Sequence, residues 1–441
     1  MITVFFPNNN VPEREYAILS LFEIIGCEVS VSSQASIYDY IISWKDRKII
    51  VRDGFWNQHK EPLSYLDKSF FPLVSRATNK FTVEDDIIVL YGNDCVEVKN
   101  KSIECGIDIF ASSFFMLTRW EEYVNTKRDN HNRFVAIDSV AYNEGFLERP
   151  IVNEYAELLW NMMSSLDGEL GRKRNGFEII PTHDIDYLYH PHRAFGLLKV
   201  SICDVLKRSN FTQAFNHLLQ LFQNDPIDTI DFIMDVSEEN GLKSHFFFMS
   251  TSWRIDKKRS SDYIYSRKFK KTIRNITRRG HYVGFHPGYF SYNNDKQWRL
   301  EKELLEEKSQ LKIVEGRQHY LMCSLPTTLS IWADSGMEMD STLSYSDRIG
   351  FRCGTGNKFF FYDFLNRKRT QLKELPLIAM DKTLVATVGV DGMKNKLQSL
   401  FTLGKRYSMP ITILFHNTIF GEKDGMCIRN IYQSALKALN E

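Results

Sequence analysis

The sequence predicts an α/β protein in which a smaller N-terminal α/β domain precedes a barrel-like C-terminal domain. From residue 177 onward, short apolar runs alternate with stretches of helical periodicity, an order that implies parallel strands covered by outer helices. The length of 441 residues also favours two domains over one. A polar, glycine-containing stretch at 164–175 is the expected boundary, so we assign residues 1–170 to the first domain and residues 171–441 to the second.

In the N-terminal domain, an apolar run at 2–6 predicts a strand, and Pro12 and Gly26 mark the start and the end of the helix that follows. Residues 106–165 have mainly helical character. Further apolar runs predict strands at 38–42, 48–51 and 86–91. The sequence contains no glycine-rich loop here that would cradle a phosphate, and the role of this domain stays open.

In the C-terminal domain, the alternation can be followed element by element. Apolar runs predict strands at 177–184, 244–250, 281–286, 313–322, 337–341 and 411–416. Helical periodicity predicts helices at 227–240, 261–279, 296–311, 326–335, 393–408 and 424–439. Residues 207–226 and 342–392 are less regular, so we expect loops or small additions there.

Composition and charge exclude some classes of protein. A net charge near +1 gives no overall attraction to nucleic acid or to an acidic membrane. The seven cysteines are scattered and form no Cys-x-x-Cys pair, which fits a reducing compartment better than a disulfide framework. The N-terminus lacks a basic region followed by an apolar run, and no run of about 18 apolar residues occurs later. We therefore expect a cytoplasmic protein without a transmembrane segment.

Two carboxylates stand at the end of the first strand of the C-terminal domain. Asp184 and Asp186 are two residues apart, so a strand would project both to the same side. Two like charges at one place are costly, and a divalent metal is the usual reason to hold them there. The sequence therefore predicts a metal site at this strand end.

Further polar side chains follow at the ends of later strands. They are His286, the pair Arg317 and His319, Asp340, and His416. In a barrel of parallel strands, the carboxyl ends of the strands meet at one face, where active sites lie. Histidine beside carboxylate suits a borderline metal such as zinc, cobalt, nickel or iron. We therefore expect these residues and the two aspartates to form one site.

The order of these motifs resembles that of the polysaccharide deacetylases with a NodB-homology domain, carbohydrate esterase family four. That resemblance covers about residues 175–440 and implies a distorted (β/α)-barrel that holds a divalent metal. Thr-His-Asp-Ile-Asp, ending at Asp186, looks like the family's Thr-Phe-Asp-Asp motif, which implies that Asp184 is the catalytic base and Asp186 a metal ligand. His286 stands where the family's His-Ser/Thr-x-x-x-His motif begins, which implies a second ligand.

The remaining motifs imply the other roles. Arg317 begins a stretch that resembles the family's Arg-x-Pro-Tyr motif, in which the arginine orients the base. His416 resembles the histidine of the closing Leu-x-His motif, which supplies the acid, and Asp340 would tune that acid. The whole chain is also similar to a two-part bacterial subgroup found with surface-polysaccharide genes, through the stretches at 117–123, 145–150 and 350–352.

One departure from the family leaves a ligand open. Position 290, where the family has its second histidine, is Phe290. His319 is our choice for the third ligand, with a water molecule or Asp340 as alternatives. The aspartates are also not adjacent, as they are in the family, so the roles of Asp184 and Asp186 could be exchanged.

The resemblance implies a metal-dependent hydrolase that removes N-acetyl groups from an amino sugar of a bacterial surface polysaccharide or its precursor. Zinc is the expected metal, with cobalt, nickel or iron as alternatives. A second hypothesis is a catalytically inactive carbohydrate-binding or scaffold protein on the same fold, which Phe290 favours. A third is another metal-dependent amide or ester hydrolase. The expected partner is a carbohydrate, an N-acetylated sugar substrate, with no nucleic acid, and the sequence does not indicate an oligomeric state.

Overall fold

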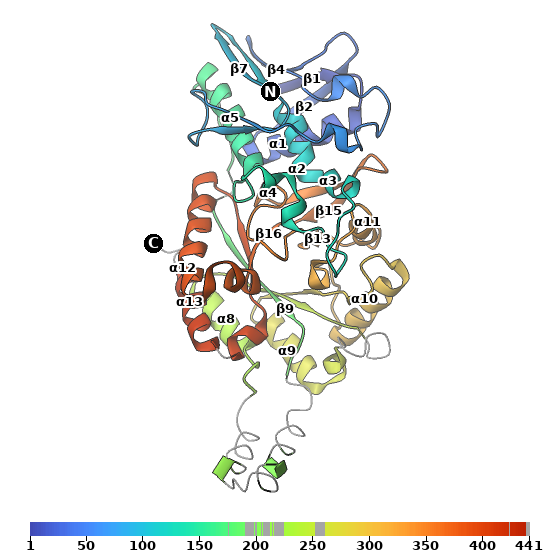
Figure 1. Ribbon diagram of the computed structural model, residues 1–441, viewed down its shortest axis with the longest axis vertical. Helices are drawn as coiled ribbons and strands as arrows, with labels where there is room; N and C mark the ends of the chain where they lie inside the picture. The colour runs from blue at the N-terminus through green and yellow to red at the C-terminus, as the bar shows by residue number, and fades with distance from the viewer. Residues whose placement is uncertain are drawn as a thin grey trace.

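The structure of the protein is a computed structural model that describes residues 1–174, 176–189, 225–251, 261–422 and 424–437, with isolated residues between 198 and 215. Two main sheets organise the chain, one of six strands and one of nine. Figure 1 shows the six-stranded sheet at one end of the molecule and the nine-stranded sheet, surrounded by helices, below it. The protein is therefore a mixed α/β structure, as the sequence predicts.

The six-stranded sheet belongs to the N-terminal part, with the strand order β2-β1-β3-β4-β8-β7. Its strands and the short pair β5–β6 are β1 (Ile2–Pro7), β2 (Val29–Gln34), β3 (Tyr40–Trp44), β4 (Arg47–Val51), β5 (Ser75–Ala77), β6 (Ile87–Val89), β7 (Gly92–Lys99) and β8 (Ser102–Ile107). The helices are α1 (Val11–Ile25), α2 (Ile109–Thr118), α3 (Trp120–Val124), α4 (Val140–Asn143) and α5 (Ile151–Leu166).

The predicted limits of the first helix are confirmed. Pro12 lies in the first turn of α1, where a missing N–H costs nothing. Gly26 ends the helix with φ of 82°, and its N–H bonds to the carbonyl of Phe22. A Cβ atom at Gly26 would lie 1.9 Å from the carbonyl oxygen of Lys173, so this position requires glycine for space as well as for its backbone angle.

The nine-stranded sheet lies in the C-terminal part, with the order β14-β15-β13-β12-β11-β10-β9-β17-β16. The strands are β9 (Ile179–Ile185), β10 (His245–Phe248), β11 (Tyr282–Phe285), β12 (Glu315–Gly316), β13 (Met339–Asp340), β14 (Phe359–Asp363), β15 (Lys368–Glu374), β16 (Leu377–Met380) and β17 (Ile411–Leu414). All neighbouring pairs are parallel except β14 and β15, which are antiparallel.

Helices surround this sheet in Figure 1. They are α8 (Ile230–Glu239), α9 (Arg267–Arg278), α10 (Asp295–Ser309), α11 (Thr327–Asp334), α12 (Asp381–Tyr407) and α13 (Gly425–Lys437). The six strands and six helices that the sequence predicts in this part correspond to β9–β13, β17 and α8–α13. The predicted strand 313–322 is wrong in extent, because only β12 is extended there and a helical turn follows at His319–Leu321. None of the helices in the described ranges combines the length and the apolar character that a membrane span requires.

The sheet is strongly curled. β15 and β16 are separated by only two residues, yet β15 pairs with β13 and β16 pairs with β17, at opposite ends of the parallel row. One stretch of chain, 368–380, therefore brings the two ends of the row towards each other. Among the described residues no strand pairing joins β16 back to β14 or β15, so the structure is a curled half-barrel and a fully closed barrel stays a prediction.

The prediction for residues 342–392 is wrong in one respect. The stretch contains β14, β15 and β16, which are three strands of the nine-stranded sheet, and the first turns of α12. Its strands were missed because β14 and β15 are joined as an antiparallel hairpin at the edge, which interrupts the strand–helix alternation on which the prediction rests. The stretch 207–226 lies mostly outside the described residues.

The N-terminal and C-terminal parts meet at a junction built from the three stretches 117–123, 145–150 and 350–352. Glu122 forms a two-pronged ion pair with Arg352, and both side chains are buried. The N–H of Phe351 bonds to the carbonyl of Leu147 at 2.8 Å. Segments more than 200 residues apart in the chain thus share one polar core. The proposed division at residue 170 falls between α5 and β9 and stays a prediction.

Glu122 is the centre of this junction. Its carboxylate also accepts a hydrogen bond of 2.9 Å from Arg119. Burial alone would raise the pKa of Glu122, but the charges of Arg352 and Arg119 outweigh burial and lower the pKa to about 2. The carboxylate is therefore ionised at neutral pH and compensates two buried guanidinium groups.

Replacing Glu122 by Ala should destabilise the protein by about 3–5 kcal/mol, because Arg352 would stay buried without its carboxylate. Urea denaturation followed by circular dichroism measures the loss as a lower midpoint. The control is Glu148→Ala, which removes a largely exposed carboxylate that pairs with Lys396 and should cost about 1 kcal/mol or less. Equal midpoints for the two variants would contradict the assigned role of Glu122.

Candidate functional site

A cavity of about 340 Å³ opens beside the carboxyl ends of the strands of the curled sheet. Asp184 lies near the end of β9, and Asp186 is the first residue after this strand. Both side chains line the cavity. His183, the residue before Asp184, instead points into the core, where its Nδ1 lies 2.7 Å from the carbonyl of Phe415. The alternation that the sequence predicts at this strand end is therefore present.

The cavity collects side chains from distant parts of the chain. Besides the two aspartates, its polar lining comprises Arg133, Tyr187, His286, His319, Tyr320, Ser346, Lys382 and His416. Five of the seven residues that the sequence assigns to the site line this cavity. Arg317 and Asp340 lie behind it and are both buried.

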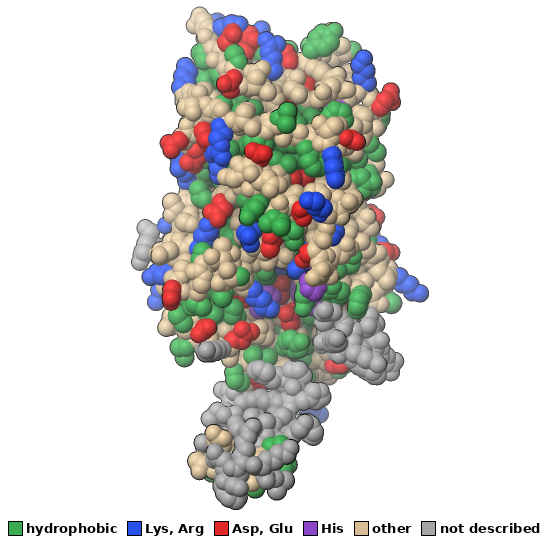
Figure 2. Space-filling model, viewed as in Figure 1, with side chains coloured by type: hydrophobic (Ala, Val, Ile, Leu, Met, Phe, Trp, Pro, Cys, Tyr) green, Lys and Arg blue, Asp and Glu red, His purple; other side chains and the backbone are tan. Residues whose placement is uncertain are grey.

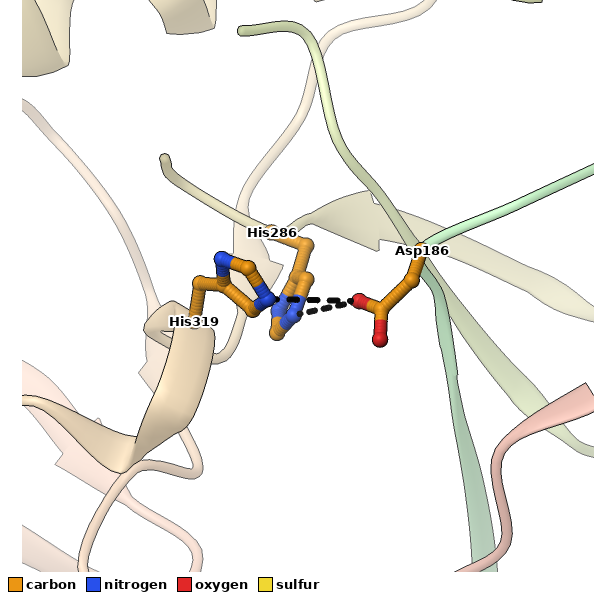
Figure 3. A group of neighbouring side chains, drawn as sticks. All are labelled: Asp186, His286 and His319. Atoms are coloured by element: carbon orange, nitrogen blue, oxygen red, sulfur yellow. Dashed lines mark ion pairs between the residues drawn. The ribbon is translucent and has the colours of Figure 1, made fainter. Parts of the chain in front are cut away.

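Asp186, His286 and His319 form a group whose potential ligand atoms lie within 4.8 Å of one another. Figure 3 shows the carboxylate facing both imidazole rings. Asp186 Oδ1 is 3.4 Å from Nε2 of His286 and 3.6 Å from Nε2 of His319. Two ligands of a tetrahedral zinc ion stand roughly 3.3 Å apart, since each lies about 2 Å from the metal. The observed spacing therefore fits a metal between these atoms.

The hydrogen bonding of the group also fits a metal. Asp186 Oδ1 and His286 Nε2 are buried and make no hydrogen bond, a costly state unless something binds them. Nδ1 of His286 lies 2.7 Å from the carbonyl of Arg317, so it carries the ring proton and leaves Nε2 as a free lone pair. Burial acts to raise the pKa of Asp186, but the neighbouring histidines lower it far below its usual value.

This donor set of one carboxylate and two imidazoles suits a divalent transition metal, and the choice of zinc over cobalt, nickel or iron stays a prediction. Of the alternatives for the third ligand, Asp340 lies outside the group in the described part of the chain. Phe290, at the position where the resembled family has a histidine, is 53% exposed and does not line the cavity.

Asp184 is held by a buried arginine. Arg317 Nη1 donates to Asp184 Oδ1 at 2.9 Å. The other two nitrogens of this guanidinium donate to the carbonyl and the hydroxyl of Ser341, at 2.8 and 2.9 Å. With all three nitrogens engaged, Arg317 fixes the carboxylate of Asp184 in one orientation. Asp184 Oδ2 lies 3.8 Å from Nε2 of His286, one of the three candidate metal ligands.

Asp340 does not contact His416, in contrast to the role that the resemblance implies. Its carboxylate accepts hydrogen bonds from the N–H and the hydroxyl of Thr342, at 3.0 and 2.6 Å. Burial raises the pKa of Asp340, which lies against the equally buried Glu374. Asp340 therefore shapes the turn that presents Ser341 to Arg317, and its influence on the site is indirect.

The carboxylate that holds His416 is Asp381, the first residue of α12. Nδ1 of His416 lies 2.9 and 3.1 Å from the two oxygens of Asp381, and the N–H of His416 donates to Asp381 at 2.7 Å. Burial acts to lower the pKa of His416, but the charge of Asp381 raises the pKa to about 9. The ring is therefore protonated at neutral pH, with Nε2 directed away from Asp381.

Sequence reasoning missed Asp381, although a signal for it exists. The residue follows the apolar run of β16 directly, in the same strand-end position as Asp184 and His416. Strand-end reasoning does not reach Asp381, because the irregular stretch 342–392 predicts loops or small additions instead of strands.

Residues 2–167 match the model of a family of unknown function (DUF7033), which accounts for less than half of the chain. No curated protein matches.

Comparison with solved structures gives distant likenesses that cover about 60% of the chain. A protein of Mycobacterium smegmatis described as a polysaccharide deacetylase is 15% identical, with 60% of this chain and 86% of that chain covered and a TM-score of 0.37. A family 4 carbohydrate esterase from Streptomyces lividans, in complex with acetate, is 10% identical, with 61% and 91% covered and a TM-score of 0.30. A CE4 family pseudoenzyme from Bacillus anthracis is 11% identical, with 59% and 63% covered and a TM-score of 0.27. At these values the likenesses carry no argument about activity, which depends on the site itself.

The pKa of His416 provides a test of the pairing with Asp381. Nuclear magnetic resonance titration of the imidazole in the metal-free protein should give a pKa of about 9, with the ring charged below that pH and neutral above it. In Asp381→Asn the pKa should fall, because the negative charge that stabilises the imidazolium is lost.

Asp340→Asn is the matched control, because it neutralises the carboxyl that does not touch His416. The pKa of His416 should stay close to its wild-type value in this variant. A lower pKa in Asp340→Asn together with an unchanged one in Asp381→Asn would contradict the assignment.

Proposed function

We propose that the protein is a metal-dependent hydrolase that removes an N-acetyl group from an amino sugar of a bacterial surface polysaccharide or its precursor. The observation that carries the proposal is the meeting, in one cavity, of a metal-ligand group, an oriented carboxylate and a protonated histidine. Asp186, His286 and His319 would hold the metal. Bound there, the metal would act as a Lewis acid on the acetamide and lower the pKa of a water molecule.

Two residues divide the proton transfers between them. Asp184, oriented by Arg317, accepts a proton from the attacking water as the water oxygen bonds to the acetamide carbon. His416 donates a proton from Nε2 to the amide nitrogen as the carbon–nitrogen bond breaks. Its charged form is stabilised by Asp381, so it is a donor at neutral pH. The products are acetate and a free amine.

A sugar substrate is supported by the sequence motifs and by the walls of the cavity. Tyr187 and Tyr320 line it beside Met249 and Leu321. Aromatic faces next to polar groups suit the apolar faces of sugar rings. The presence of His319 in the ligand group supports an active enzyme, since it supplies the donor that Phe290 cannot.

Acetate release from N-acetylglucosamine oligosaccharides, with zinc or cobalt added, tests the proposal. Asp184→Asn and His416→Ala should each lower the rate by about 10²–10⁴, because each removes a proton-transfer group. The matched control is His245→Ala, since this histidine lies at the opposite end of β10 and pairs with Glu315. It should keep the wild-type rate.

Retained activity in Asp184→Asn or His416→Ala would remove that residue from the mechanism. Absence of acetate release from every N-acetylated sugar, in a metal-loaded protein that still binds the sugars, would favour the non-catalytic carbohydrate-binding protein.

A further inference from the structure

The cavity is lined by two basic side chains that have no role in the proposed mechanism. Arg133 comes from the N-terminal part, between α3 and α4, and Lys382 is the second residue of α12. In the middle of the face drawn in Figure 2, basic side chains lie next to histidine side chains. The proposed deacetylation requires a metal, a base and an acid, and it assigns no role to Arg133 or Lys382.

The guanidinium of Arg133 is held in place by its own loop. The carboxylate of Asp129 accepts hydrogen bonds from Nε of Arg133 and from the N–H groups of His131 and Arg133, each at 2.9 Å. Nη1 of Arg133 donates to the carbonyl of Tyr320 at 3.1 Å. Tyr320 directly follows the metal-ligand candidate His319. The guanidinium of Arg133 therefore lies near the group formed by Asp186, His286 and His319.

The loop is in turn docked on the rim of the C-terminal part. Nδ1 of His131 lies 3.0 Å from the hydroxyl of Tyr289, and Nδ2 of Asn132 donates to the hydroxyl of Tyr292 at 2.6 Å. Fixing a long charged side chain costs conformational entropy. A guanidinium that is ordered in advance loses less when a ligand binds, which is the arrangement expected of a recognition group.

Lys382 stands on the side of the cavity that holds the acid. Its N–H donates to Asp381 at 2.6 Å, and Asp381 holds His416. The side chain of Lys382 is exposed, and no carboxylate in the described part of the chain forms an ion pair with it. Its ammonium group is therefore available to a ligand.

We propose that Arg133 and Lys382 bind an oxyanion, a phosphate or a carboxylate, carried by the N-acetylated sugar. This inference rests on the proposed function and names its substrate class. A bound divalent metal would balance the charges of Asp184 and Asp186, and Asp129 pairs with Arg133 through Nε and Nη2. Lys382 therefore adds a positive charge that a neutral sugar cannot use, and Arg133 adds ordered N–H donors. Arginine binds phosphate and carboxylate through paired hydrogen bonds, and lysine adds a point charge. The N-terminal part thus supplies a specificity residue to the site of the C-terminal part.

The test compares three substrates: a neutral N-acetylglucosamine tetrasaccharide, N-acetylglucosamine 1-phosphate, and an N-acetylglucosamine–glucuronate disaccharide. Arg133→Gln and Lys382→Gln should each lower kcat/KM for an acidic substrate roughly 10- to 100-fold, mainly through a higher KM, because a charge-assisted hydrogen bond is lost. The rate with the neutral tetrasaccharide should stay unchanged. Arg133→Lys should restore part of the loss, because it keeps the charge without the fork.

Arg299→Gln is the matched control, since Arg299 is partly exposed, pairs with Asp295 and does not line the cavity. It should leave all three substrates unaffected. Preference for the phosphate would identify a phosphorylated precursor, and preference for the uronate an acidic polymer. Equal effects of Arg133→Gln on neutral and acidic substrates, or no effect on either, would overturn the inference while the proposed function stands.

Calorimetric titration separates the two claims if no substrate releases acetate. Tighter binding of N-acetylglucosamine 1-phosphate than of N-acetylglucosamine by the wild type, lost in Arg133→Gln and Lys382→Gln, would support the anion site although the proposed function fails. Equal affinities for the two sugars would overturn the inference.

Discussion

The site depends on holding two carboxylates, Asp184 and Asp186, at the end of one strand. Their repulsion is overcome because each has a different partner. Asp184 has the buried guanidinium of Arg317, and Asp186 faces two imidazoles. This separation also divides their chemistry, because a carboxylate fixed by arginine is suited to accept a proton and one facing imidazoles is suited to a metal. The order of roles expected from the sequence stays a prediction, and this geometry supports it although the aspartates are not adjacent.

Much of the site could be predicted because it follows from strand periodicity and strand ends. Four of its side chains lie at or just after the end of a strand of the parallel row: Asp184, Asp186, His286 and His416. The ends of parallel strands meet at one face regardless of the course of the connecting loops. His319 could be chosen only as one alternative, since it lies in a short helical turn, where periodicity gives no direction.

Features that depend on packing between remote segments could not be predicted in the same way. The choice between Asp340 and Asp381 as the partner of His416 depends on how β16 pairs with β17, and the strand period of residues 342–392 does not reveal that pairing. The junction of Glu122 with Arg352 joins residues 230 positions apart. The loop of Arg133 is held at the cavity by tyrosines of the other part, which lie more than 150 residues away in the chain. The polar contacts between the two parts thus shape the site as well as the fold.

Metal content measured by elemental mass spectrometry tests the central claim most directly. The purified wild-type protein, supplied with zinc, should hold close to one metal ion per chain. His286→Ala and His319→Ala should each weaken metal binding by more than about 100-fold, since even indirect ligand partners cost roughly 10- to 100-fold. His245→Ala, a histidine of the same sheet outside the ligand group, should keep the metal. A wild-type protein that holds no zinc, cobalt, nickel or iron would contradict the account, and so would variants that retain the metal as tightly as the wild type.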